Sequence, residues 1–224
     1  MRIAAWMTPH PACVSPETPI TELRELLHGK GCRHVPVVDA AGLLVGVVSD
    51  RDQRTAFPSS VLEPVLAPEH AERLAQVPVS AIMGRPPVAL PLEATLDDAL
   101  LLFDRHHVGA LPVVDDGGAV VGLVTMRDVL RAYRRLFGIG IAGSSLVEIP
   151  DDGEANLLAR IATALESGGI ACTSLVRVER PGSAPGVVSA RVQTYNTHAV
   201  REALRAAGLA ALSNRSPPGA GEGR

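Results

Sequence analysis

Two short stretches of the chain carry the same pairing of a hydroxyl and a carboxylate three residues apart. Ser49 precedes Asp52 in GLLVGVVSDRD, and Thr125 precedes Asp128 in GAVVGLVTMRD. In each stretch the apolar residues indicate a buried strand, and a helix is expected to begin at the hydroxyl. A helix start suits a phosphate group, and a carboxylate, which only accepts hydrogen bonds, suits the hydroxyls of a ribose. The pattern therefore predicts nucleotide-type contacts at two places.

The same Ser/Thr-x-x-Asp pattern is also an ordinary helix start. The hydroxyl can cap the first turn of the helix, and the acid is favoured by the helix dipole. Taken alone, each stretch fits this structural interpretation better than it fits a ligand site.

An internal repeat surrounds the two stretches and shows which elements must position them. Residues 7–52 align without a gap with residues 83–128, at a constant offset of 76 residues, and both copies contain Pro-Val-Val-Asp. A gapless repeat of this length indicates two similar units packed as a pseudo-symmetric pair.

Each unit is expected to contain an extended segment, a helix, a hairpin and a final helix. Thr18, followed by Pro19, is the predicted cap of the first unit's helix, and Thr95 caps the helix of the second. The predicted hairpin strands are 35–39 with 43–48 and 111–115 with 119–124. Residues 57–80 are broken by prolines and are predicted to form a linker with one helical turn at 69–76.

The remainder of the chain has a different organisation. After a glycine-rich junction (137–143), we expect a strand (146–149), a helix (154–167), two strands (170–180 and 187–195), a helix (197–207) and a short final strand (209–212). This β-α-β-β-α-β order predicts a ferredoxin-like sandwich over residues 144–212. Residues 213–224 are polar and rich in Pro and Gly, and they are predicted to be disordered.

Composition narrows the class of protein. The 224 residues are 46% hydrophobic and only 3% aromatic, with a net charge of −3, which argues against single-stranded nucleic acid bound by base stacking. No apolar run is long enough to span a bilayer, and the N-terminal sequence does not resemble a signal peptide. We therefore expect a soluble, cytoplasmic protein with no nucleic-acid or membrane partner.

No group of residues indicates an enzyme or a metal protein. The three cysteines are scattered, and no nucleophile, base and orienting group occur together. His106 and His107 are interpreted as solvated residues at the end of a helix, and the arginines between 131 and 135 as a solvated helix face. We predict a non-enzymatic protein with no catalytic residue, bound metal or cofactor.

The repeated unit resembles the CBS domain, and the pair resembles a Bateman module. The motifs that carry the resemblance are RHVPVVD (33–39), GVVSDRD (46–52), GALPVVD (109–115) and GLVTMRD (122–128). It implies an α+β fold with CBS units at 1–56 and 81–136. Residues 144–212 resemble an ACT domain in element order, although the loop 151–154 lacks the proline usual in that family. Two CBS units and an ACT-like domain form the layout of the acetoin-utilisation B-type proteins.

The CBS resemblance implies two clefts between the units, each of which binds an adenosine ligand. In the cleft expected to bind more strongly, Asp128 would hold the ribose, His34 with Arg33 would face the phosphates, and backbone near Val35 would contact adenine. Its residues would be Thr8, Ala12, His34, Val35, Thr125, Arg127 and Asp128. The cleft expected to bind weakly or to stay empty would contain Ser49, Arg51, Asp52, Gly84, Val88, Ala110 and Leu111.

Simpler interpretations of these residues stay open. His34 could be a partly exposed residue at the start of a strand, and Arg51 and Arg127 could be surface arginines.

Two functions follow from the resemblance. The first is a regulatory homodimer that senses AMP, ADP, ATP, S-adenosylmethionine or NAD and signals through the ACT-like domain, in acetoin or acetyl metabolism. The second is a scaffold that binds no ligand and docks on a partner enzyme.

Overall fold

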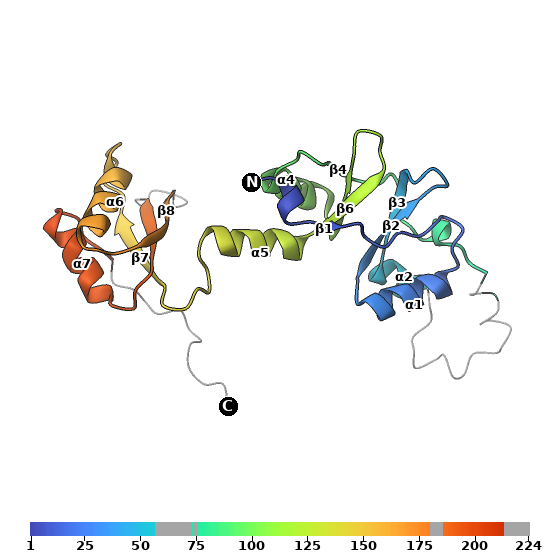
Figure 1. Ribbon diagram of the computed structural model, residues 1–224, viewed down its shortest axis with the longest axis horizontal. Coiled ribbons are helices and arrows are strands. Elements are labelled where there is room, and N and C mark those ends of the chain that lie inside the picture. Colours follow the sequence, from blue (N-terminus) through green and yellow to red (C-terminus); the bar gives the residue numbers. More distant parts are fainter. Residues whose placement is uncertain (57–72, 74–75, 180–185, 213–224) are drawn as a thin grey trace, which may run out of the picture. The chain divides into compact units, whose positions relative to one another are not determined.

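The computed structural model describes residues 1–56, 73, 76–179 and 186–212 (Figure 1). The described chain divides into two compact units, Met1–Arg131 and Ala132–Arg224. Most of the predicted linker, with its helical turn, and the predicted disordered tail lie outside the described residues.

The first unit contains two copies of a helix followed by a β-hairpin and a second helix. The first copy consists of η1 (Ile3–Ala5), β1 (Thr8–Pro9), α1 (Ile20–Lys30), β2 (His34–Val38), β3 (Leu44–Ser49) and α2 (Asp50–Ala56). The second consists of η3 (Val79–Ala81), β4 (Leu90–Pro91), α4 (Leu96–His106), β5 (Ala110–Val114), β6 (Val120–Thr125) and α5 (Met126–Leu136). The predicted elements, including both hairpins, are present within a few residues of their expected ends.

The short arms that precede the two copies exchange places. Thr8 of the first arm pairs with Leu123 on β6, which belongs to the second copy. Gly84 of the second arm pairs with Val47 on β3, which belongs to the first copy. β1 thereby joins the sheet β1-β6-β5-β4, while β2 and β3 form a separate hairpin. Each hydroxyl–carboxylate pair therefore lies beside the arm of the other copy.

Two glycines permit this exchange of arms. A Cβ atom at Gly122 would overlap the sulfur of Met7, and a Cβ atom at Gly46 would overlap the sulfur of Met83. The methionines and glycines occupy equivalent positions in the repeat, so the same close packing occurs twice.

The cap predicted for the second copy is confirmed, and the cap predicted for the first copy is wrong. Thr95 accepts a hydrogen bond from the Asp98 backbone N–H, and the Asp98 carboxylate accepts from the Thr95 N–H, which completes a capping box. In the first copy Pro19 is the N-cap, with no side-chain cap. Thr18 instead accepts from the Ser15 N–H at 3.1 Å, because its hydroxyl closes the preceding turn.

The core of the first copy includes a side chain from the last residues of the predicted linker. Val79, which we placed in the linker, is fully buried with residues of α1, β2 and β3, and its N–H donates to the Thr18 carbonyl. The residues buried in this cluster are Val14, Leu23, Leu27, Val35, Val37, Val48 and Val79. Residues 77–80 thus pack as part of the first copy of the repeat.

The second unit is an antiparallel sheet covered on one face by two helices. Its elements are β7 (Ser145–Pro150), α6 (Leu157–Ser167), β8 (Cys172–Val178), β9 (Val187–Val192) and α7 (Thr197–Ala206), with strand order β7-β9-β8. Alternate residues of β7 and β9 are buried against α6 and α7, in a core that includes Val147, Ile161 and Leu204.

The strand predicted at residues 209–212 is wrong. This segment lies beside β7, where the Leu212 N–H donates to the Glu148 carbonyl at 2.7 Å, but it does not form a strand. The described sheet is therefore three-stranded. No helix among the described residues combines the length and apolar character that a bilayer crossing requires.

Candidate functional site

A cleft of about 930 Å³ opens in the first unit beside Ser49. Its walls come from the ends of β2 and β3, the start of α2, the arm at 84–88 and the turn between α4 and β5. It contains six of the seven residues assigned to the cleft expected to bind weakly: Ser49, Arg51, Asp52, Gly84, Val88 and Ala110. The seventh, Leu111, is fully buried in the core behind it. We call this space the Ser49 cleft.

The hydroxyl and the carboxylate of the Ser49 cleft are bonded to each other. The Ser49 N–H and hydroxyl both donate to Oδ2 of Asp52, at 2.8 and 2.6 Å, and the Asp52 N–H contacts the Ser49 oxygen at 3.2 Å. These are the contacts of a capped helix start. The bonds that described residues make to this carboxylate all use Oδ2, which leaves Oδ1 of Asp52 for another donor.

The Thr125 copy has the same two bonds to its carboxylate, with one addition. The Thr125 N–H and hydroxyl donate to Oδ2 of Asp128 at 2.9 and 2.7 Å. Its other oxygen, Oδ1, accepts from the Arg131 guanidinium at 2.7 Å. The position equivalent to Arg131 in the first copy is Thr55. Both copies are therefore genuine helix starts, and they differ in whether the second carboxylate oxygen already has a charged partner.

His34, which the resemblance assigned to the Thr125 side, lines the Ser49 cleft. It pairs with Ser49 across the β2–β3 hairpin, and a Cβ atom at Gly109 would lie only 2.6 Å from its Nε2. The imidazole therefore occupies the space left open by Gly109. Burial lowers the pKa of His34, Arg33 lowers it further, and Asp52 and Asp50 oppose the shift. The ring is thus predominantly neutral at neutral pH.

The other residues assigned to the Thr125 side are only partly brought together. Thr8 is exposed on β1, next to β6, and Arg127 is exposed on α5. Ala12 is half-buried on the same arm as Thr8. Val35 is fully buried in the core, so its side chain is unavailable to a ligand.

The Ser49 cleft gathers more positive charge than the sequence interpretation assigned to it. Its lining includes four arginines and three histidines, against two aspartates: Arg33, Arg51, Arg54, Arg85, His34, His106, His107, Asp50 and Asp52. Arg54 is paired with Asp50, and Arg85 donates to the Ser80 carbonyl. Within the described part of the chain, the exposed Arg33 and Arg51 make no ion pair.

Sequence reasoning missed the contribution of Arg85, His106 and His107 to this cleft. The histidines are exposed at the end of α4, and His107 ends that helix in the left-handed conformation, with φ 53°. The available signal was their position directly before the strand that supplies Ala110, which the resemblance had already placed in a cleft.

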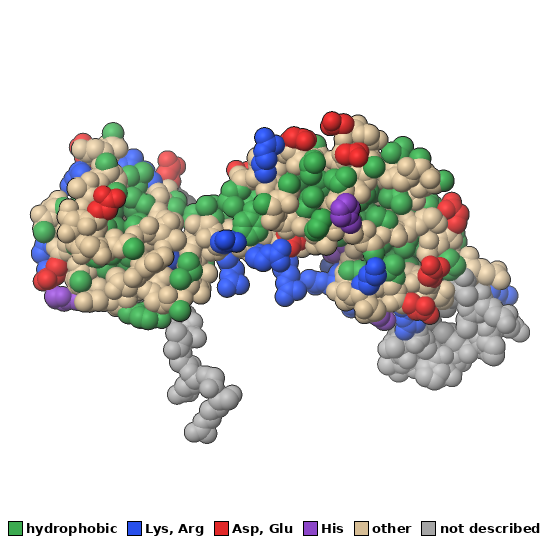
Figure 2. Space-filling view, in the orientation of Figure 1, with side chains coloured by type: hydrophobic (Ala, Val, Ile, Leu, Met, Phe, Trp, Pro, Cys, Tyr) green, Lys and Arg blue, Asp and Glu red, His purple; other side chains and the backbone are tan. Residues whose placement is uncertain are grey.

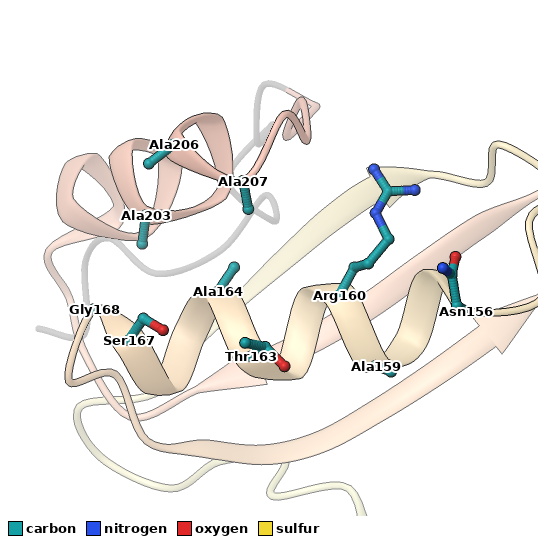
Figure 3. A pocket seen from close by; sticks show the side chains of 10 residues that line it. All are labelled: Asn156, Ala159, Arg160, Thr163, Ala164, Ser167, Gly168, Ala203, Ala206 and Ala207. Carbon is teal, nitrogen blue, oxygen red and sulfur yellow. The ribbon is translucent and has the colours of Figure 1, made fainter.

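A second hollow lies between α6 and α7 in the second unit, with a volume of about 560 Å³. Figure 3 shows Ala164 on α6 and Ala203 on α7 on its two sides, with Arg160 and Asn156 toward one end. Arg160, the charged residue of this lining, is paired with Asp152 at 2.8 Å. This hollow lacks the clustered polar groups of the Ser49 cleft. Nowhere in the described ranges do three metal-binding side chains converge on one point.

Comparison with known proteins identifies the family. The CBS domain model matches residues 3–52 and 79–135. A CBS domain-containing protein of Dictyostelium discoideum is 36% identical over 104 residues, which cover 46% of this chain and 71% of that protein. Inosine-5'-monophosphate dehydrogenase of Aquifex aeolicus is 29% identical over 122 residues. That match spans 54% of this chain but only 22% of the enzyme.

Two solved structures extend the comparison. The CBS-pair protein CBSX2 of Arabidopsis thaliana has a TM-score of 0.52 and 30% identity, covering 59% of this chain and 93% of that one. CBSX2 has also been solved in complex with AMP. A Vibrio cholerae protein assigned to acetoin utilization (AcuB) has a TM-score of 0.50 and 25% identity, covering 62% of this chain and 94% of that one. The chain belongs to the CBS domain family and carries two CBS domains in tandem.

Proposed function

We propose that the CBS pair is a regulatory sensor that binds a phosphate-bearing adenosine ligand in the Ser49 cleft. The observation that carries this proposal is the cleft itself, where a carboxylate with a spare oxygen and several cationic side chains line one space of about 930 Å³. This volume lies within the range of small-molecule sites, which is roughly 300–1,000 Å³.

The ligand's parts match the lining residues by their chemistry. Asp52 accepts from the ribose hydroxyls through Oδ1, because its other oxygen already serves the helix start. Arg33 and Arg51, which have no ion pair among the described residues, contact the phosphates. Guanidinium groups bind phosphate oxygens through paired hydrogen bonds, so arginine suits this role.

The charge of the cleft favours one class of adenosine ligand. Even with the histidines left out of the count, four arginines face two aspartates. A nucleoside di- or triphosphate neutralises this excess, whereas the sulfonium of S-adenosylmethionine adds to it. We therefore rank ADP and ATP above AMP, and AMP above S-adenosylmethionine. The AMP complex of CBSX2 supports an adenosine ligand in general.

The second unit is proposed to be an ACT-like output domain. Its β-α-β-β-α order and its β7-β9-β8 sheet support this assignment, although the final strand is missing from the described residues. The likeness to the Vibrio cholerae protein supports a role in acetoin metabolism. We also propose that the protein forms a homodimer, is located in the cytoplasm and docks on a partner enzyme. The proposed domain boundaries are those expected from the sequence.

Isothermal titration of the full chain with ATP, ADP, AMP and S-adenosylmethionine tests the function and the cleft together. We expect the nucleotides to bind in the order given above, and Asp52→Asn to weaken ADP binding at least tenfold, as the loss of a charged acceptor predicts. Asp128→Asn is the matched change in the other copy and should leave the affinity within about twofold. Circular dichroism confirms that both variants are folded.

Two results would contradict the proposal. Binding that is lost in Asp128→Asn and kept in Asp52→Asn would move the ligand to the Thr125 side. The absence of heat from any of the four compounds would favour the scaffold that binds no ligand.

A further inference from the structure

Arg131 differs from the other arginines of α5. Figure 2 shows Lys and Arg side chains gathered along this helix, and Arg127, Arg134 and Arg135 are exposed on it. Arg131 reaches back to Asp128, whose side chain is only 9% exposed, with its own side chain 61% exposed. The same guanidinium nitrogen makes a longer contact, 3.4 Å, with the Trp6 carbonyl. Arg131 therefore joins the start of α5 to the N-terminal arm.

This ion pair occupies the atom that a ligand would need. Oδ2 of Asp128 already accepts two bonds from Thr125, so Oδ1 is the oxygen to which a ribose could donate. The Asp128 carboxylate is an ionised acceptor for either donor, but only the guanidinium adds a full opposite charge, and it is already held beside the carboxylate on the same helix. Exchange of Arg131 for a ribose at Asp128 is therefore unfavourable.

The first copy supplies an internal comparison. Asp52 makes the same bonds to Ser49, but Thr55 stands where Arg131 stands in the second copy. Among the described residues, no guanidinium is bonded to Oδ1 of Asp52. One residue thus separates a carboxylate that can receive a ligand from one that is already satisfied.

We propose that Arg131 blocks a second nucleotide position at Thr125 and Asp128, so that the CBS pair binds one ligand per chain. The class of ligand rests on the function proposed above, but the block itself rests on the contacts of Asp128. Replacement of Arg131 by threonine, the residue at the equivalent position 55, opens the second position.

The test is the stoichiometry of ADP binding to the full chain, measured by isothermal titration for the natural protein and for Arg131→Thr. We expect one ADP per chain in the natural protein and two in the variant, with the added site lost in Arg131→Thr/Asp128→Asn. Arg134→Thr removes the same charge from an exposed position on the same helix and should keep one ADP per chain.

The outcomes separate this proposal from the proposed function. Equal stoichiometry in Arg131→Thr and the natural protein overturns the block, whether that number is one or zero. No binding by the natural protein, with one site gained in Arg131→Thr and lost in the double variant, supports the block and refutes the Ser49 cleft. A gain of a site that survives Asp128→Asn also overturns the block.

Discussion

At the scale of single residues, the two repeated motifs have one local geometry and two chemical states. Both hydroxyl–carboxylate pairs cap the start of a helix, so the structural interpretation of the pattern holds for both. Capping does not exclude ligand binding, because it uses one oxygen of each carboxylate. The difference between the copies comes from a neighbour outside the motif, Arg131, and from the position of His34 opposite Gly109.

The pH dependence of stability tests the environment of His34. Because burial and Arg33 lower its pKa in the folded state, the unfolded chain takes up this proton more readily. The free energy of unfolding therefore falls as the pH drops below the unperturbed value of about 6.5, and the full penalty is reached once the pH is below the folded pKa. We expect His34→Gln to lose less stability than the natural protein between about pH 7.5 and pH 5 in urea titrations.

A second histidine provides the control for this measurement. His28 is exposed on α1, and His28→Gln should keep the pH dependence of the natural protein. The described environment of His34 would be wrong if His34→Gln and His28→Gln lost stability equally over this pH range.

At the scale of elements, the structure assigns different roles to the two predicted helix caps. Thr95 and Asp98 cap α4 reciprocally, while Thr18 belongs to the turn before α1. Thr95→Ala should lower the free energy of unfolding by about 1 kcal/mol, the typical cost of a lost cap. Thr18→Ala, measured in the same denaturant titration, should cost less because it removes no helix cap. A larger loss for Thr18→Ala would show that the cap predicted from the sequence exists in solution.

The sequence predicted most elements because their signals are local. Hairpin turns, helix ends and the 76-residue repeat depend on residues close together in the chain, and both hairpins form within one residue of the predicted ends. The prediction failed where the local structure depends on contacts that the sequence pattern does not show. The segment at 209–212 reads as a strand, but only Leu212 is seen to bond to β7, and Pro19 shifts the start of α1 beyond Thr18.

At the scale of the whole molecule, the repeat predicts symmetry and the structure shows where it is broken. The structure brings six of the seven residues expected at the weaker cleft to one space and buries Leu111, but the expected ranking of the clefts depended on His34. Its side chain lines the Ser49 cleft because Gly109 leaves space there, which no local pattern reveals. The ion pair of Asp128 with Arg131 was also missed, because an arginine run resembles a solvated face.

A crystal structure of the full chain grown with ADP tests the central claim most directly. We expect nucleotide density in the Ser49 cleft, with the ribose on Asp52 and the phosphates near Arg33 and Arg51, and with Arg131 still bonded to Asp128. A nucleotide seated on Asp128, with Arg131 displaced and the Ser49 cleft without nucleotide, would contradict both the choice of cleft and the role given to Arg131.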